Sequence, residues 1–555
     1  MNTIDLLIKN ANIVTIDEQN NRARSLAVSN GVISQIWTAP EPPQDEINLT
    51  SETKVIDLKE ATLIPGFIDT HNHLLMYSLF RKQVNCSTPP NESIPDILEK
   101  VKEQVAATPE GEWVLGWGYD NTLLSEERHP TRKELDRIAP DIPVFIRHIS
   151  SHFAAVNSKA LEIAGIAEDI EDPQGGRFGR DETGRLNGVL HELPALAPVQ
   201  AAIPTASVEE MASLIGEASN DYLAQGITTN SDAGVGLDLG IAEFDAHLKA
   251  LEQGNNPLRM RFMVLHHLLN QEGPFQHYSA KQLEEEIQNR SKNRATLDSA
   301  KLFQDGSIQG ITAALREPYY CEPETYGELL HNQKDFNGEI LDLHKRGFRI
   351  AIHGNGDRAI ESILDAYEYA LTAEPRTDHR HRIEHIQTGT SEDLNRMKAL
   401  DVAGSFFINH VYYWGDRHKR IFLGPDRAEQ INPLADALER DILYTLHSDC
   451  PITPISPLFS IWAAVNRQTM KGEVLGEDQT ISVEKALRTM TIDGAKLNFD
   501  EDKSGSIEVG KLADFAVLEA DPTVIDPIKI KDINVMATII DGKLVYGQET
   551  FPDPN

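Results

Sequence analysis

The chain has 555 residues, 40% of them hydrophobic, so it is long enough for more than one domain and apolar enough for packed cores. Its formal net charge of −34 argues against nucleic acid and anionic membrane as main partners. Three scattered cysteines without a CxxC spacing predict a reducing compartment. Because we find neither a signal peptide nor an apolar run of about 20 residues, we expect a cytoplasmic protein.

Both ends of the chain contain short predicted strands. Residues 5–16 alternate between apolar and polar, and residues 25–36 form a predicted hairpin with Asn30-Gly31 at its turn. Near the other end, residues 505–518 and 537–546 have the same pattern. We therefore predict a small β-sandwich domain formed by residues 1–63 and 490–555. Two unrelated β caps are the less favoured alternative.

Between these ends, apolar strands alternate with helical stretches. Eight such strands lie at residues 66–69, 226–232, 260–266, 300–306, 348–354, 382–385, 402–408 and 442–449. The alternation predicts an α/β fold, a (β/α)8 TIM barrel formed by residues 64–76 and 207–489, with its active site at the carboxyl ends of the strands. The interval after the first strand is too long for one connection, so we predict an inserted α/β subdomain at residues 77–206, over the barrel mouth.

Metal-binding residue types recur at the predicted strand ends. His71 and His73 are two residues apart, so both side chains can turn to the same face of a strand. Together with His353, His385 and Asp449 they form a set that suits a zinc-type site with one or two ions. Taken alone, His71 and His73 could also be two ordinary histidines in a loop, and it is the later strand ends that favour a site.

Lys301 also lies at a predicted strand end, although an ammonium group is no metal ligand. A lysine that is desolvated and neutral can react with CO₂, and the resulting carbamate can bridge two metal ions. The alternative is a buried lysine paired with Asp305 or Asp449. Residue types alone leave both interpretations open.

Several stretches of the chain carry a family resemblance. They are residues 64–73 (IPGFIDTHNH), 152–161 (HFAAVNSKAL), 301–307 (KLFQDGS), 352–359 (IHGNGDRA), 382–385 (RIEH), 448–452 (SDCPI) and 505–515. In these stretches the chain resembles the amidohydrolase superfamily of metal-dependent hydrolases. Within it, the chain is similar to the YtcJ-like branch, amidohydrolase family 3, which includes N-substituted formamide deformylases.

The resemblance implies a role for each strand-end residue. His71 and His73 match the ligands of a first, more buried metal, and His353 and His385 match those of a second. Lys301 matches the N6-carboxylated lysine that bridges the two ions. The remaining match is Asp449, which binds metal and shuttles the proton. The expected cofactor is a divalent metal, with zinc the expected ion, at one or two ions per chain.

The activity implied by the resemblance is hydrolysis of a non-peptide C–N bond in a small amide or formamide-like molecule. A metal-bound hydroxide would be the nucleophile, because a metal ion lowers the pKa of its bound water to about 7. Ester, lactone or cyclic-amide hydrolysis on the same site is an open alternative. A catalytically silent binding or regulatory protein is an alternative of another class.

Residues outside the metal set are candidates for contacts with the small-molecule substrate. They are His152, Trp117, Tyr119, Asp120 and Glu192. For His152 a structural role is an equal alternative, and aromatic residues after a strand more often belong to a core. Four further histidines near strand ends are candidates for groups that support the ligands, namely His266, His267, His410 and His447. A homodimer is an open expectation.

Overall fold

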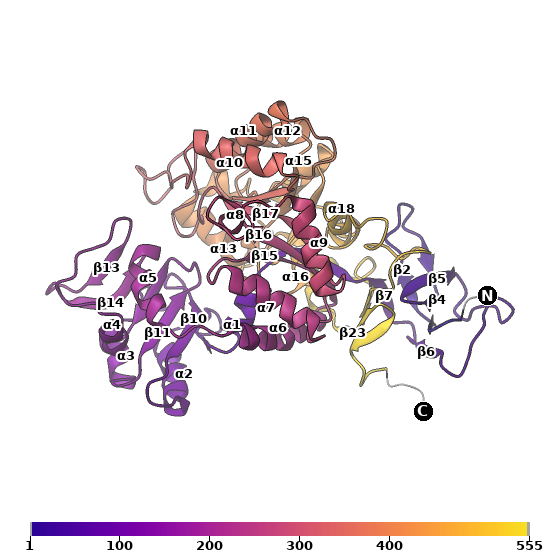
Figure 1. Cartoon of the computed structure of the whole chain (residues 1–555), viewed down its shortest axis with the longest axis horizontal. Helices are drawn as coiled ribbons and strands as arrows, with labels where there is room; N and C mark the ends of the chain where they lie inside the picture. The colour runs from indigo at the N-terminus through magenta and orange to yellow at the C-terminus, as the bar shows by residue number, and fades with distance from the viewer. Residues whose placement is uncertain (1–2, 552–555) are drawn as a thin grey trace. The chain divides into compact units, whose positions relative to one another are not determined.

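Eight parallel strands form a nearly closed barrel in the computed structural model, which describes residues 3–551 (Figure 1). In sheet order they are β8 (Phe67–Asn72), β15 (Ile227–Val235), β16 (Arg259–Leu265), β17 (Ala295–Phe303), β18 (Ile350–Gly354), β19 (Arg382–His385), β20 (Ala403–Phe406) and β21 (Tyr444–Leu446). The predicted α/β barrel is therefore confirmed. All eight strands overlap the predicted apolar runs, although β17 begins at Ala295 rather than at residue 300.

The first and last strands of the barrel meet at their carboxyl ends. The amide of His73 donates to the carbonyl of Cys450 (2.7 Å), and the amide of Asp449 donates to the carbonyl of His71 (3.1 Å). These bonds hold the segment after β21 against the end of β8. Two stretches that are far apart in sequence thus share one edge of the barrel.

Helices alternate with the barrel strands along the chain. They include α6 (Val208–Leu223), α7 (Ile241–Glu252), α9 (Ala280–Ser291), α10 (Gln333–Lys345), α11 (Asp357–Ala373), α12 (Ser391–Ala399) and α15 (Leu434–Glu439). Two of them begin at capping boxes, α9 at Ser279 and α12 at Thr390. Figure 1 shows α10, α11, α12 and α15 grouped together. Among residues 3–551, every helix is too short or too polar to cross a bilayer.

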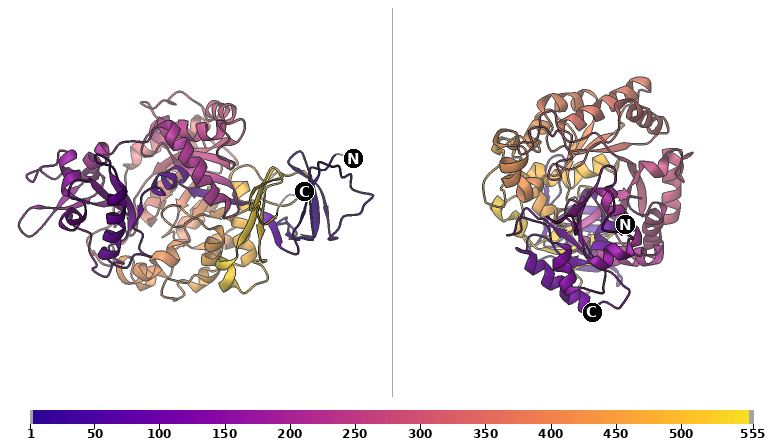
Figure 2. Two further views of the ribbon diagram at one scale, coloured as in Figure 1. Left: turned by 90° about the horizontal axis from the view of Figure 1, so that it is seen from below. Right: turned by 90° about the vertical axis from the view of Figure 1, so that its left-hand side faces the viewer.

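Two mixed β-sheets are formed near the ends of the chain, one from N-terminal strands alone and one from strands of both ends. One contains β1 (Leu6–Lys9), β4 (Ser25–Ser29), β5 (Val32–Trp37) and β6 (Lys54–Asp57), and the other β2 (Asn12–Val14), β3 (Arg22–Ala23), β7 (Thr62–Pro65), β22 (Phe515–Leu518), β23 (Val535–Ile540) and β24 (Lys543–Tyr546). In the second sheet β7 pairs antiparallel with β22, so N- and C-terminal strands lie side by side (Figure 2). Asn30 and Gly31 have φ of 53° and 74°, as the predicted hairpin turn requires.

One hydrophobic core joins these two sheets. Its buried members come from both ends of the chain and include Leu6, Ile8, Leu26, Phe515, Val517 and Ile539. The sheet formed by both termini is therefore confirmed. Because β7 is followed directly by β8, this domain leads straight into the first barrel strand.

Met76–Met211 form a compact unit distinct from the rest of the chain. Its six-stranded sheet has the order β13 (Arg177–Arg180), β14 (Leu186–His191), β12 (Phe153–Val156), β11 (Val144–His148), β10 (Val114–Tyr119) and β9 (Val84–Asn85). Helices α2 (Ile94–Ala107), α3 (Arg132–Ile138), α4 (Ser158–Ile163) and α5 (Leu193–Ala202) complete it. The boundaries predicted for the three domains, and a place for the insert over the barrel mouth, stay predictions.

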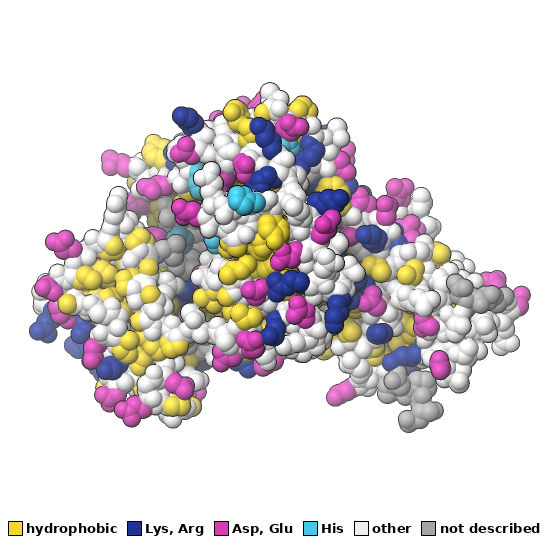
Figure 3. All heavy atoms as spheres, in the orientation of Figure 1, with side chains coloured by type: hydrophobic (Ala, Val, Ile, Leu, Met, Phe, Trp, Pro, Cys, Tyr) yellow, Lys and Arg dark blue, Asp and Glu magenta, His cyan; other side chains and the backbone are white. Residues whose placement is uncertain are grey.

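Charged side chains of both signs are interspersed over the face shown in Figure 3. Many of the acidic groups form ion pairs, as where Arg396 contacts both Asp365 (2.8 Å) and Glu368 (3.0 Å). Exposed pairs of this kind contribute little to stability, and they keep the surface well hydrated. The excess of acidic residues is therefore consistent with a solvated surface.

Candidate metal centre

The end of β8 and the segment after β21 bring three ligand-type side chains together. His73 Nε2 lies 3.2 Å from Asp449 Oδ1, and His71 Nε2 lies 3.6 Å from the same oxygen. All three side chains are almost fully buried, and their ligand atoms lie within 4.8 Å of one another. Tetrahedral bonds of about 2.0–2.1 Å place zinc ligands about 3.3 Å apart. The observed spacing therefore suits one ion of this size.

Two residues at the site have a left-handed backbone that non-glycine residues seldom adopt. Asp449 has φ of 52° and His385 has φ of 74°. Such conformations cost about 1–3 kcal/mol each and cluster at functional sites. At His385 the unusual backbone changes the face of the strand to which the side chain points. Neighbouring strand residues point to opposite faces, yet both Glu384 and His385 contact His71, because the backbone at His385 breaks the alternation.

Burial disfavours protonation of two of the imidazoles in this region, those of His71 and His353. Burial, and then the positive charge of Lys301, hold the pKa of His71 well below its usual range. The same two causes lower the pKa of His353 to about 3. Burial raises the pKa of Asp449, against the opposing effect of His73. A neutral imidazole is the form that binds a metal, so the protonation states fit a metal centre.

Lys301 is fully buried near the carboxyl end of β17. Among the described residues its Nζ has no hydrogen-bond partner, and burial lowers its pKa to about 8, against the opposing charges of Glu384 and Asp449. Asp305 is engaged elsewhere, because it accepts the amides of Asn355 and Gly356. The structure therefore lacks the predicted alternative, a hydrogen-bonded pair with Asp305 or Asp449, and the orphaned amine fits a group that carries a further substituent.

His353 and His385 lie beside the three-residue group without joining it. Their ring centroids are 4.4 Å apart, and the His385 ring is 4.8 Å from that of His71. His353 Nε2 lies 3.1 Å from the carbonyl oxygen of Gly306 and 2.9 Å from Asn355 Nδ2. All six residues predicted for the metal set thus lie in or beside one buried region, and the three that converge most closely are His71, His73 and Asp449.

Glu384 was missed by the sequence reasoning. Its Oε2 accepts a hydrogen bond of 2.6 Å from His71 Nδ1. Together with His447 these residues form a second group of ligand types. A separation of 2.6 Å is a charge-assisted hydrogen bond and leaves no space for an ion between the two atoms. The sequence did contain one indication of Glu384. It lies in the RIEH stretch, two residues after Arg382, so both side chains point to the same face of the strand.

His447 was predicted as a supporting group, and it contacts two of the metal-set histidines. Its Nε2 lies 3.2 Å from His385 Nδ1, and its ring stacks on His71 at a centroid distance of 4.6 Å. Its Nδ1 lies 2.7 Å from Ser405 Oγ. By contrast, His266 pairs with Glu339 at 2.6 Å.

The remaining candidates lie within Met76–Met211. His152 Nδ1 lies 2.8 Å from Glu192 Oε2, both side chains are partly exposed, and Glu192 has φ of 66°. Tyr119 is fully buried in a hydrophobic cluster, with its hydroxyl 2.9 Å from His129 Nδ1. Asp120 accepts the amide of Thr122 (2.9 Å).

Trp117 is half-buried, with its ring 5.0 Å from that of Phe80. Like the other candidates of this unit, it makes local contacts that would also suit a structural role. Substrate contacts by His152, Trp117, Tyr119, Asp120 and Glu192 therefore stay predictions.

Comparisons with known proteins agree with this geometry. A profile of the amidohydrolase family matches residues 54–546. The chain is 30% identical over 543 residues to the putative amidohydrolase YtcJ of Bacillus subtilis, covering 96% of this chain and 98% of that protein. It is 30% identical over 553 residues to the N-substituted formamide deformylase of Arthrobacter pascens, covering 98% of each. An uncharacterized metal-dependent hydrolase from Pyrococcus horikoshii has a similar structure, with a TM-score of 0.74, 25% identity, and coverage of 94% of this chain and 99% of that one.

Proposed function

Because the chain belongs to amidohydrolase family 3, in its YtcJ-like branch, we propose that it hydrolyses a C–N bond other than a peptide bond in a small amide or formamide. The observation that carries this proposal is the convergence of His71, His73 and Asp449 within 4.8 Å in a buried site. The choice of a formamide-like substrate is supported by the similarity to N-substituted formamide deformylase.

In this proposal His71, His73 and Asp449 hold one divalent ion, with zinc as the expected metal. His353 and His385 hold a second ion when two are bound. The neutral amine of Lys301 could add to CO₂ and lose a proton to give the N6-carbamate, whose oxygens would then be available as metal ligands. A bound ion supplies Lewis acidity and lowers the pKa of water at the site to about 7.

Residues of the chain carry out the proton transfers. Asp449 takes the proton of the attacking water and passes it to the leaving nitrogen, as a general base and then a general acid. Burial raises its pKa, which brings the carboxylate closer to the pH at which such transfer is efficient. His71 and His73 would hold the ion, and the proton transfer is assigned to Asp449.

A second hypothesis is that the same site hydrolyses an ester, lactone or cyclic amide. Both hypotheses use the same residues, so substrate preference distinguishes them. A silent binding or regulatory protein is less well supported, because all six positions of the predicted metal set hold the matching residue types.

The decisive experiment measures the metal content of the purified chain by elemental mass spectrometry, without added metal. About one or two zinc-like ions per chain are expected, and two would favour the carbamate bridge. A panel of N-substituted formamides, acetamides, esters, lactones and cyclic amides is then assayed. A ratio near zero that added metal cannot raise would overturn the proposal.

We further propose that the protein is cytoplasmic and acts on a small molecule without nucleic acid or membrane as a partner. A homodimer is the assembly to test, and light scattering coupled to size-exclusion chromatography gives the mass directly. A mass near twice the 61.8 kDa of the chain would support it.

A further inference from the structure

A buried carboxylate links His71 to a guanidinium inside the barrel. Glu384 Oε2 lies 2.6 Å from His71 Nδ1, and Glu384 Oε1 lies 2.5 Å from Arg382 Nε. All three side chains are almost completely shielded from solvent. The Arg382 Nε–H can only donate, so Glu384 Oε1 accepts from it, and the other carboxylate oxygen, Oε2, faces the ring nitrogen of His71.

This pairing determines which ring nitrogen of His71 carries the proton. Since Glu384 accepts, the proton lies on His71 Nδ1 and the lone pair on Nε2. Nε2 is the atom that lies 3.6 Å from Asp449 Oδ1, in the three-residue group. A wrong tautomer would place a proton where a metal ion must bind.

Besides Glu384, Arg382 contacts Asp298 and the backbone of Thr70. Its Nη1 lies 3.0 Å from Asp298 Oδ1, and the same oxygen lies 2.8 Å from Arg349 Nη2. Its Nη2 also donates to the carbonyl of Thr70 (3.4 Å), the residue before His71. Residues of β8, β17 and β19, together with Arg349 just before β18, thus form one polar network around Arg382 and Glu384.

We propose that Arg382 and Glu384 are positioning residues, which hold His71 in the one tautomer and orientation that offers Nε2 to a metal ion. This inference rests on the proposed function in requiring metal at His71. The competing explanation is a structural ion pair that stabilises the barrel. A purely structural pair would change the melting temperature and leave the metal affinity of the folded chain unaltered.

Glu384→Gln separates these explanations. Glutamine has one oxygen acceptor, and the charged Arg382 Nε–H takes it, so the amide NH₂ faces His71 Nδ1. His71 must then accept at Nδ1 and carry its proton on Nε2. We expect zinc affinity, measured by competition with a chelator, to fall about 10- to 100-fold. The melting temperature of the metal-free variant should stay close to that of the unaltered chain.

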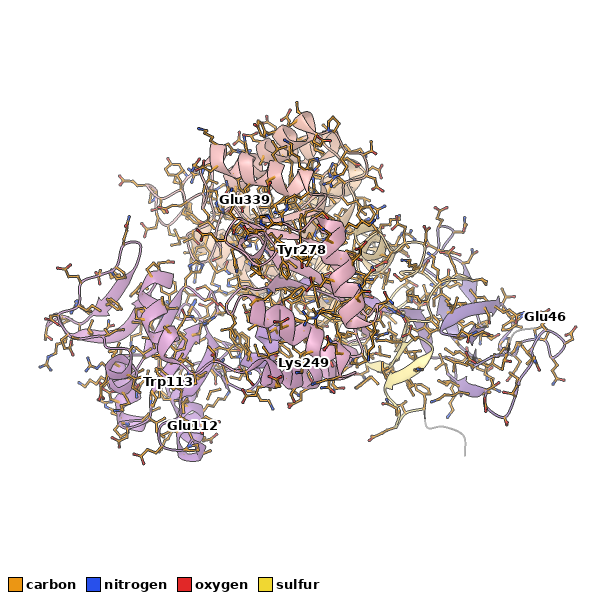
Figure 4. All side chains as sticks on the ribbon, viewed as in Figure 1. Glu46, Glu112, Trp113, Lys249, Tyr278 and Glu339 are labelled. Atoms are coloured by element: carbon orange, nitrogen blue, oxygen red, sulfur yellow. The ribbon has the colours of Figure 1, made fainter. Side chains whose placement is uncertain are left out.

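The matched control is Glu339→Gln on α10 (Glu339 is labelled in Figure 4). Glu339 Oε1 lies 2.6 Å from His266 Nδ1, the same carboxylate–imidazole distance, in a partly exposed setting outside the predicted metal set. Its zinc affinity should equal that of the unaltered chain. A Glu384→Gln variant that binds zinc as tightly as Glu339→Gln would overturn the proposal.

A measurement on the unaltered chain tests the proposal even if the Glu384→Gln variant does not fold. In the proton NMR spectrum of the cobalt(II)-bound chain, ring N–H protons of ligand histidines give strongly shifted resonances. One of these protons is expected to exchange slowly with D₂O, because His71 Nδ1–H is buried against Glu384. Rapid exchange of every shifted ring N–H would overturn the proposal. If the unaltered chain hydrolyses amides with metal bound and the Glu384→Gln variant binds zinc with unchanged affinity, the positioning role alone fails. If the unaltered chain binds no metal, both proposals fail.

Discussion

Gly234, which lies near the end of β15, limits the space around His73. A Cβ added at this position would lie 2.7 Å from His73 Nδ1 and 3.2 Å from its Cε1. Ordinary contact requires about 3.5 Å, so the ring of His73 must move by about 0.8 Å in Gly234→Ala. Metal sites tolerate about 0.2 Å in their ligand distances. The displacement therefore exceeds the tolerance of the site, although the new side chain touches no metal.

We expect zinc affinity to fall about 10- to 100-fold in Gly234→Ala, which corresponds to about 1.4–2.8 kcal/mol. Chelator competition gives the affinity, and thermal unfolding of the metal-free protein shows whether the fold is kept. Gly338→Ala is the matched control, because a Cβ there meets nothing within 4 Å. It should leave zinc affinity unchanged and stabilise α10 by about 0.5–1 kcal/mol. Equal affinities for the two variants would refute the reasoning.

Three further changes test the site and its surroundings. Asp449→Asn should lower turnover by about 10²–10⁴-fold with the melting temperature kept, and a near-normal rate would remove Asp449 from the mechanism. Lys301→Ala should lose activity and at least one ion per chain by elemental mass spectrometry, whereas full metal retention would argue against a bridging carbamate. Burial lowers the pKa of His344, His379 and His381 in the folded chain, so the folded state resists protonation. The free energy of unfolding should therefore fall as the pH drops below about 6.5, and equal urea midpoints at pH 7.5 and 5.5 would contradict this.

Local patterns in the sequence predicted the main elements of the fold. The alternation of strands and helices predicted the barrel, and Asn30-Gly31 predicted a hairpin turn that the structure contains. The spacing of His71 and His73 predicted that both side chains turn to one face, and both lie within reach of Asp449. These features depend on residues close together in the chain, whose geometry follows from the strand period and from turn chemistry.

The contacts that connect distant strands required the tertiary structure. The hydrogen bond between Glu384 and His71 joins residues 313 positions apart, and the left-handed backbone at His385 overrides the strand alternation that sequence reasoning assumes. Likewise, only the structure shows that Lys301 Nζ has no hydrogen-bond partner among the described residues and that Asp305 accepts other donors. Closing the barrel sets these distances, because it brings the ends of eight strands to one edge, and no local pattern encodes which side chains then meet.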